Sequence, residues 1–179
     1  MALSGVEAGN TSLCTVGNSG NDLHYRGYDI LDIAENCEFE EIAHLLIYKK
    51  LPTQKELDKY KKKLIEKRGL SKKILTILEQ LPASSHPMNV LQTATSALGC
   101  MNREKQCSYG DDGIEDLSNG LLANLGTALI YWFHYSQSNK RICLESDSDS
   151  IAGHFLNLLH TNKCNDEWIQ AMQISLNLY

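Results

Sequence analysis

Along most of this chain, apolar residues recur at the three- and four-residue spacing that places them on one face of a helix. In the segment that begins at Phe39, for example, we expect Phe39, Ile42, Ala43, Leu46 and Ile47 to point inward. The pattern predicts a mainly α fold with about seven or eight helices. The clearest of them cover residues 39–50, 53–69, 72–82, 86–100, 117–136, 151–160 and 167–179.

The first 30 residues have a different pattern. Two short β-prone runs flank a turn rich in Gly and Asn that includes Gly17 and Gly20, which is typical of a β-hairpin. The sequence therefore predicts two parts. Residues 1–30 form a hairpin segment, and residues 31–179 form part of a larger helical domain.

Several short motifs define where the helices begin and end. Thr53 followed by Glu56 is a capping box, and Pro87 suits the first turn of a helix. Either Asp149 or Ser150 is expected to cap the helix over 151–160. Two polar segments, 102–113 and 136–149, are predicted to be loops, the second with a short strand at 141–144.

The last predicted helix has an apolar face that continues to the final residue. Asn165 and Asp166 provide a start signal, but no capping Gly or Asn and no basic last turn provides a stop. We therefore expect these helices to form half of a core that further polypeptide covers. The face comprises Trp168, Ala171, Met172, Ser175, Leu176 and Tyr179.

Composition and charge narrow the class of protein. The apolar content of 42% and the charged content of 22% are those of an ordinary globular protein, and the N-terminus does not resemble a secretory signal. We expect a cytoplasmic protein with no membrane or nucleic-acid partner. The segment 49–73 holds 11 of the 17 basic residues and three acidic ones, and we interpret it as a solvated helix face.

The sequence contains no complete catalytic motif. No His pair has the spacing of a metal site, and the six cysteines are scattered without a C-x-x-C pair, so we expect free thiols and no metal. Two arginines are candidates for binding. Arg26 lies in a tight bend beside Gly27, and Arg68 ends a helix before Gly69. Arg68 could bond the last carbonyls of its helix or clamp a carboxylate or phosphate in a cleft.

Four segments resemble the N-terminal half of the citrate synthase family, and in particular its methylcitrate branch: "LHYRGYDILDIAENCEFEEIAHLLIYKKLPT", "HPMNVLQTATSALG", "DSIAGHFLNLLH" and "AMQISLNLY". The resemblance implies a mostly helical homodimer with an active site between two domains. It also implies a condensation of propionyl-CoA with oxaloacetate that gives 2-methylcitrate and CoA. No cofactor is expected, because the CoA thioester is itself a substrate.

The same resemblance assigns few site residues to this chain. In the family the catalytic histidines and aspartate lie beyond the last motif, so no catalytic residue is expected here. Arg68 matches a substrate-site arginine, and Arg26 matches an arginine that can approach the phosphate of CoA. Two other functions stay open: citrate synthesis from acetyl-CoA, and a non-catalytic helical module that binds a partner through Trp168, Met172, Leu176 and Tyr179.

The chain also departs from the family pattern. Lys49 and Thr161 stand where glycine is usual, Ser71 replaces a proline, and Asn89 replaces an aspartate. If residue 49 must adopt a left-handed conformation, a lysine there costs roughly 1 kcal/mol relative to glycine.

Overall fold

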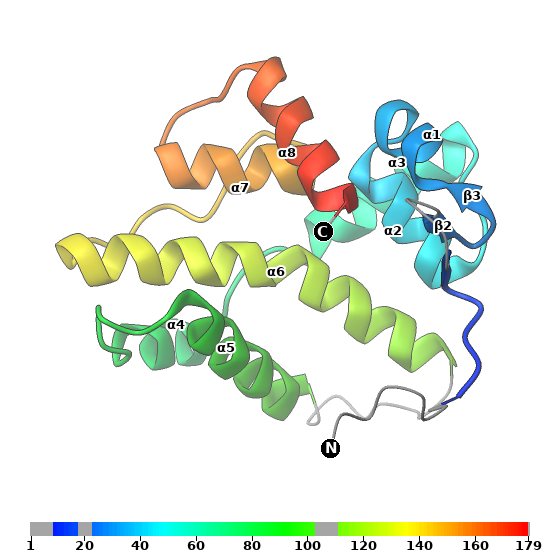
Figure 1. Cartoon of the computed structure of the whole chain (residues 1–179). Coiled ribbons are helices and arrows are strands. Elements are labelled where there is room, and N and C mark those ends of the chain that lie inside the picture. Colours follow the sequence, from blue (N-terminus) through cyan, green and yellow to red (C-terminus); the bar gives the residue numbers. More distant parts are fainter. Residues whose placement is uncertain (1–8, 18–22, 103–110, 179) are drawn as a thin grey trace.

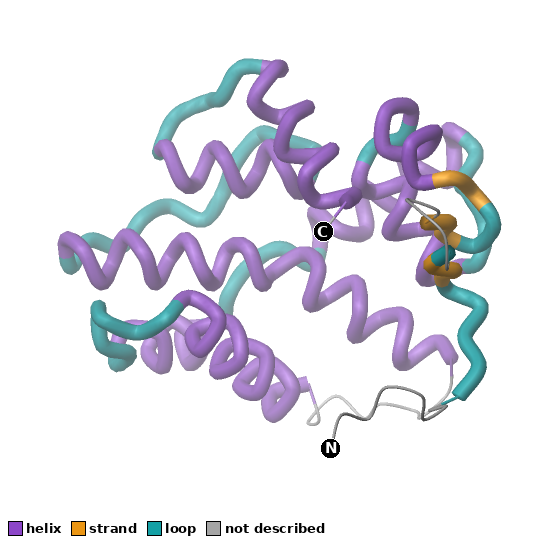
Figure 2. Tube along the Cα trace, in the orientation of Figure 1, coloured by secondary structure: helices purple, strands orange, loops and turns teal. Residues whose placement is uncertain are grey.

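The structure is a computed structural model that describes residues 9–17, 23–102 and 111–178. Its described part consists of eight helices and one small sheet (Figures 1 and 2). The strands are β1 (Cys14–Val16), β2 (Leu23–Tyr25) and β3 (Tyr28–Asp29). The helices are α1 (Ile30–Asn36), α2 (Phe39–Tyr48), α3 (Gln54–Glu66), α4 (Lys72–Glu79), α5 (Pro87–Asn102), α6 (Asp111–Ser138), α7 (Ile151–His160) and α8 (Asp166–Leu178). The mainly α prediction is confirmed.

The predicted N-terminal hairpin is present and carries a third strand. β1 and β2 pair antiparallel, with Cys14 opposite Tyr25, and β3 then pairs antiparallel with β2. Arg26 and Gly27 make the tight bend between β2 and β3, at φ angles of 50° and 91°. Glycine adopts such angles without strain, whereas arginine rarely does. The division of the chain into domains at residue 30 stays a prediction.

Helix α6 lies at the centre of the molecule. In Figure 1 it runs between the α4–α5 pair on one side and α7 on the other. Its buried residues Ala128, Tyr131 and Trp132 join one core cluster with residues of the neighbouring helices, as the apolar pattern of 117–136 predicted. The other buried members of this cluster are Ile74, Leu78, Val90 and Ala94.

Two loop predictions need correction. Residues 111–113 of the predicted loop 102–113 are helical, because α6 begins at Asp111; residues 103–110 lie outside the described part. The predicted strand at 141–144 is also wrong, since no strand occurs in the described stretch 139–150. Arg141 instead pairs with Glu79 of α4 (Nε to Oε1 2.8 Å), and Ile142 packs on the core.

The last helix returns to the first strands. Asn177 of α8 is buried; its amide donates to the carbonyl of Cys37 at 3.2 Å, and the Tyr25 hydroxyl donates to the carbonyl of Asn177 at 3.3 Å. Only part of the predicted apolar face is covered. Trp168 is 60% exposed, and Met172 is half-buried. Helix α8 thus closes the fold with one side and leaves Trp168 in contact with solvent.

The predicted helix caps are largely observed. Thr53 and Glu56 form a capping box at the start of α3, and Ser150, rather than Asp149, caps α7 by accepting from Gly153 N at 3.0 Å. Lys49 and Thr161 both adopt the left-handed conformation, with φ angles of 69° and 54°. These two residues therefore occupy conformations that glycine adopts with less strain.

Candidate functional site

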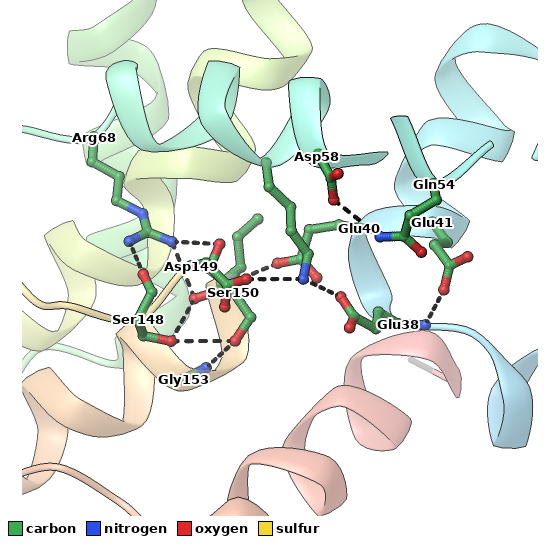
Figure 3. Close-up of polar contacts among 12 residues, drawn as sticks. Glu38, Glu40, Glu41, Gln54, Asp58, Arg68, Ser148, Asp149, Ser150 and Gly153 are labelled. Carbon is green, nitrogen blue, oxygen red and sulfur yellow. Dashed lines mark hydrogen bonds and ion pairs between the residues drawn. The ribbon is translucent and has the colours of Figure 1, made fainter. Parts of the chain in front are cut away.

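Arg68 lies just beyond the C-terminal end of α3 and reaches the segment before α7 (Figure 3). Its Nη1 donates to the carbonyl of Ser148 at 2.6 Å, and its Nη2 donates to the carbonyls of Asp149 and Ser150 at 3.3 and 3.1 Å. The Arg68 guanidinium does not bond the last carbonyls of α3, although these were the simplest partners to predict from the sequence. Its Nε is buried and has no partner among the described residues.

Asn124 of α6 fixes the backbone on which Arg68 is placed. Its side-chain oxygen accepts from Gly69 N at 3.0 Å, and its amide donates to the carbonyl of Lys67 at 2.8 Å. These bonds satisfy backbone groups that the end of a helix leaves without intrahelical partners. The backbone that carries the Arg68 side chain is therefore held in place by α6.

A buried carboxylate lies near this arginine. Glu40 of α2 is fully buried; its Oε1 accepts from Ile151 N at 2.6 Å, and its Oε2 has no partner among the described residues. Burial is the main cause that raises the pKa of Glu40 above its ordinary value, and the negative charge of Glu38 adds to it. The sequence alone did not single out Glu40. The available signal was its position one turn before Ala43 and His44, on a largely buried face of α2.

Lys61 of α3 links two acidic side chains beside Glu40. It forms ion pairs with Glu38 and with Asp149, whose Oδ2 lies 3.2 Å from Nζ (Figure 3). These acids raise the pKa of Lys61 above its ordinary value, although burial acts in the opposite direction. The segment before α7 is therefore held from α3 by two cations, Arg68 at its backbone and Lys61 at a carboxylate.

His154 of α7 is buried with both ring nitrogens engaged. Nδ1 lies 2.8 Å from the hydroxyl of Ser146, and Nε2 lies 3.0 Å from the hydroxyl of Thr127. Burial, together with the positive charge of Arg68, lowers the pKa of His154 to about 4. The imidazole is neutral at pH 7 and links α7 to α6 and to the segment that precedes α7.

A cavity of about 710 Å³ adjoins this cluster, between the segment 142–150 and helices α7 and α8. The acidic side chains that line it outnumber the basic ones, so it offers a poor environment for an anionic substrate held by this chain alone. The charged lining residues are Glu38, Glu145, Asp147, Asp149 and Asp166, against Lys61 and Lys163.

Arg26, the second candidate, lies in the bend between β2 and β3, and its side chain reaches the end of α2. Its Nε and Nη2 donate to the carbonyl of Leu46 at 3.3 and 2.8 Å, and its Nη1 donates to the hydroxyl of Ser12 at 3.3 Å. A smaller cavity of about 280 Å³ opens here, lined by Arg26, Lys49 and three hydroxyl side chains. Arg26 and Arg68 have no hydrogen-bond partner in common.

The described residues offer no cluster for a metal ion, and their cysteines are unpaired. There, no group of three or more His, Cys, Asp or Glu side chains is arranged to hold a metal ion. The five described cysteines are free thiols, and Cys107 lies outside the described residues. None of the described helices is long and apolar enough to cross a membrane.

Sequence comparison shows the family. The protein-family model described as "Citrate synthase, C-terminal domain" matches residues 2–179. The chain therefore belongs to the citrate synthase family. It is 43% identical to 2-methylcitrate synthase of Shewanella oneidensis, over 99% of this chain and 46% of the relative. It is 32% identical to 2-methylcitrate synthase 1 of Corynebacterium glutamicum, over 89% of this chain and 42% of the relative. The chain thus spans about half the length of the curated relatives it matches.

Solved structures agree with this assignment. The citrate synthase of Thermoplasma acidophilum, in a ternary complex with carboxymethyl coenzyme A and oxaloacetate, matches with a TM-score of 0.87 and 29% identity. That match covers 99% of this chain and 46% of the other. The citrate synthase of Thermotoga maritima matches with a TM-score of 0.82 and 28% identity, over 98% of this chain and 45% of the other.

Proposed function

We propose that this chain is the N-terminal portion of a methylcitrate-type condensing enzyme, which joins propionyl-CoA to oxaloacetate and releases 2-methylcitrate and CoA. The observation that carries the proposal is the 43% identity to a 2-methylcitrate synthase over 99% of the chain. The citrate synthases among the relatives are less similar, such as that of Saccharolobus solfataricus at 28%.

The condensation requires groups of three kinds. A carboxylate takes a proton from the carbon beside the thioester, and hydrogen-bond donors stabilise the enol that forms and polarise the keto group of oxaloacetate. Cations hold the dicarboxylate in register with the enol. We assign the catalytic histidines and aspartate to the part of the whole enzyme that this chain does not span.

Arg68 is our candidate for the contribution of this chain to the dicarboxylate site. Burial lowers the pKa of Arg68, yet the guanidinium stays charged because its ordinary pKa is far above neutrality. Nη1 and Nη2 hold the segment before α7 and Nε is buried, so a substrate carboxylate reaches this guanidinium only when one of these contacts opens. Arg26 is assigned to the phosphate of CoA because it matches an arginine of the family that can approach this phosphate.

A thiol-release assay tests the reaction. The purified chain is mixed with oxaloacetate and propionyl-CoA, and free CoA is detected with 5,5′-dithiobis-nitrobenzoate. We expect no release above the rate without protein. Clear turnover by the chain alone would show that it holds the catalytic groups, and would overturn their assignment to the rest of the enzyme.

The second candidate function is citrate synthesis from acetyl-CoA, which the citrate synthases among the solved relatives favour. The two are separated by joining this chain at residue 179 to the remainder of the Shewanella relative and comparing kcat/KM for both thioesters. We expect propionyl-CoA to be preferred. An acetyl-CoA preference, despite a remainder of methylcitrate type, would favour citrate synthesis.

The same proposal covers assembly and location. The enzyme is a cytoplasmic homodimer that needs no cofactor beyond its CoA thioester substrate and has no nucleic-acid or membrane partner. The partly exposed face of α8, with Trp168 at 60% exposure, supports burial by further polypeptide. Analytical ultracentrifugation of the fused enzyme is expected to give a dimer, and a stable monomer would contradict this.

A further inference from the structure

The segment that leads into α7 is held by side chains. Within the described chain, residues 140–149 form no hydrogen bond between two backbone groups. Segment 145–151 is held instead by polar contacts, and the described side chains that make them from outside it are Glu40, Lys61, Arg68 and His154. In Figure 3, Arg68 and Glu40 approach the segment from two sides. A segment without a backbone ladder opens at a lower free energy than the helical core.

Glu40 is a buried carboxylate with one oxygen left unpartnered. Its side chain is fully buried; Oε1 accepts from Ile151 N at 2.6 Å, and Oε2 has no partner among the described residues. Lys61 and Arg68 carry the nearby positive charges, but in the described chain neither forms an ion pair with Glu40. An ionised carboxylate in this position therefore lacks hydrogen bonds that water would supply.

The charges that face Glu40 come from several neighbouring parts of the fold. The titratable groups concerned are Glu38 on α2, Tyr60 and Lys61 on α3, Arg68 after α3, and Asp149 in the segment itself. No described titratable group of α6 or α8 is among the causes that shift the pKa of Glu40. Burial raises the pKa of Tyr60, so its hydroxyl stays neutral, and burial lowers the pKa of His154 to about 4. The carboxylates therefore outnumber the cations while Glu40 is ionised, and they balance once it takes up a proton.

Opening of segment 145–151 would change the proton affinity of Glu40. In the closed state, burial holds the pKa of Glu40 above its ordinary value of 4.5. Once the segment moves away, water reaches Oε2 and the pKa falls toward that ordinary value. The closed state therefore binds the proton more tightly, so that loss of the proton favours opening as the pH rises from 4.5 toward the raised pKa.

We propose that the charge of Glu40 controls access to Arg68. When the carboxylate is ionised, segment 145–151 opens and withdraws the carbonyls of Ser148, Asp149 and Ser150 from the guanidinium. When the carboxyl group is protonated, the segment stays closed and the guanidinium stays occupied. The inference rests on the proposed function only in giving the freed Arg68 a dicarboxylate to bind; the opening itself belongs to this chain alone.

Hydrogen exchange tests the opening on the whole chain. Exchange is followed by mass spectrometry over a range of pH, in a peptide that spans 148–155, for the unaltered chain and for Glu40→Gln. Glutamine keeps the shape of the side chain and an oxygen that can accept from Ile151 N, but it has no charge. The ratio of the two rates at each pH cancels the intrinsic pH dependence of exchange and the titration of His154. We expect the unaltered chain to exchange faster, with a ratio that rises by up to about tenfold per pH unit above 4.5 and then levels off.

Two controls isolate the buried carboxylate. Glu35→Gln removes an exposed carboxylate from α1, and the ratio of its rate to that of the unaltered chain should stay constant with pH. Peptides from the middle of α6 should exchange more slowly than 148–155 at every pH, because the core around Tyr131 opens only on global unfolding. The proposal is overturned if the ratio for Glu40→Gln does not change with pH, or if the two peptides exchange at the same rate, so that no local opening exists.

The consequence for the substrate is a separate arm, made with the chain joined at residue 179 to the remainder of the Shewanella relative. KM for oxaloacetate is compared between this fused enzyme and its Glu40→Gln variant. We expect the KM of the variant to exceed that of the unaltered enzyme by a factor that grows with pH, while kcat does not change. A pH-dependent exchange ratio with equal KM values would support the opening and count against Arg68 as a dicarboxylate ligand. The thiol-release assay of the chain alone does not depend on either result, so the two proposals fail separately.

Discussion

The two candidate arginines each lie just after an element of secondary structure, β2 or α3, yet their surroundings differ in kind. Arg68 donates to three backbone carbonyls beside a buried carboxylate and an ion-paired lysine. Arg26 donates to the backbone carbonyls of Leu46 and Ser12 and to the Ser12 hydroxyl, beside an unpartnered lysine. The start of α7 is thus a region where donors and acceptors nearly balance, whereas the end of α2 has donors in excess. Changes in the first region should affect stability, and changes in the second should affect binding.

Arg68→Met should give the largest effect. It leaves three carbonyls without their charged donor and removes one of the cations near Glu40, so we expect a loss of about 3 kcal/mol in the free energy of unfolding. Urea denaturation measures it. Lys62→Met, at an exposed position of α3, is the matched control and should change stability by less than about 0.5 kcal/mol. Equal losses in the two variants would contradict the distinction between the regions.

Gly153→Ala tests how closely the start of α7 is packed. A Cβ at this position would lie 2.2 Å from Ser148 Oγ and 3.0 Å from Ser150 Oγ, which disturbs the cap of the helix. We expect a loss of about 2 kcal/mol on urea denaturation. Gly120→Ala in α6 meets nothing within 4 Å and should instead stabilise the chain by up to about 1 kcal/mol. A neutral Gly153→Ala would show that the serine segment repacks freely.

The pH dependence of stability should reveal His154. Its pKa is about 4 in the folded chain against 6.5 for an unperturbed histidine, so the unfolded chain binds the proton more readily. The stabilisation is complete above pH 6.5 and is lost as the pH falls from 6.5 toward 4, by roughly 1 to 2 kcal/mol. Comparison with His154→Gln at each pH isolates this contribution from that of Glu40, whose raised pKa changes stability in the opposite sense. Parallel curves for the two proteins would refute it.

The sequence was sufficient for the features that depend on local periodicity. The positions of the helices after α1, the capping box at Thr53 and the hairpin follow from spacing and turn chemistry, whereas spacing left Asp149 and Ser150 as alternative caps of α7. It was insufficient where partners are distant in the chain. The predicted strand at 141–144 failed because Arg141 and Ile142 contact α4 and the core instead of another strand.

The candidate site shows the same division. Arg68 was identified as a residue of interest, but its partners lie about 80 residues later and no local signal names them. Glu40 was missed because its neighbour Glu41 is also acidic, and only the turn-by-turn geometry of α2 places one of them inside. The roles expected for the two arginines came from the family resemblance. Which of their nitrogen atoms remain free depends on contacts between distant segments of the chain.

The smallest predicted effect compares the two left-handed caps directly. Thr161→Gly at the end of α7 and Lys49→Gly at the end of α2 relieve the same backbone strain, so each should stabilise the chain by about 1 kcal/mol in phosphate-free buffer. Differential scanning calorimetry of both variants checks this. Thr161 does not line the small cavity, so its replacement should change stability alone. Replacement of Lys49, which lines that cavity together with Arg26, should raise stability and weaken binding of the CoA phosphate. If Lys49→Gly were instead destabilising, its ammonium would already be serving the fold, and the excess of donors at the end of α2 would not exist.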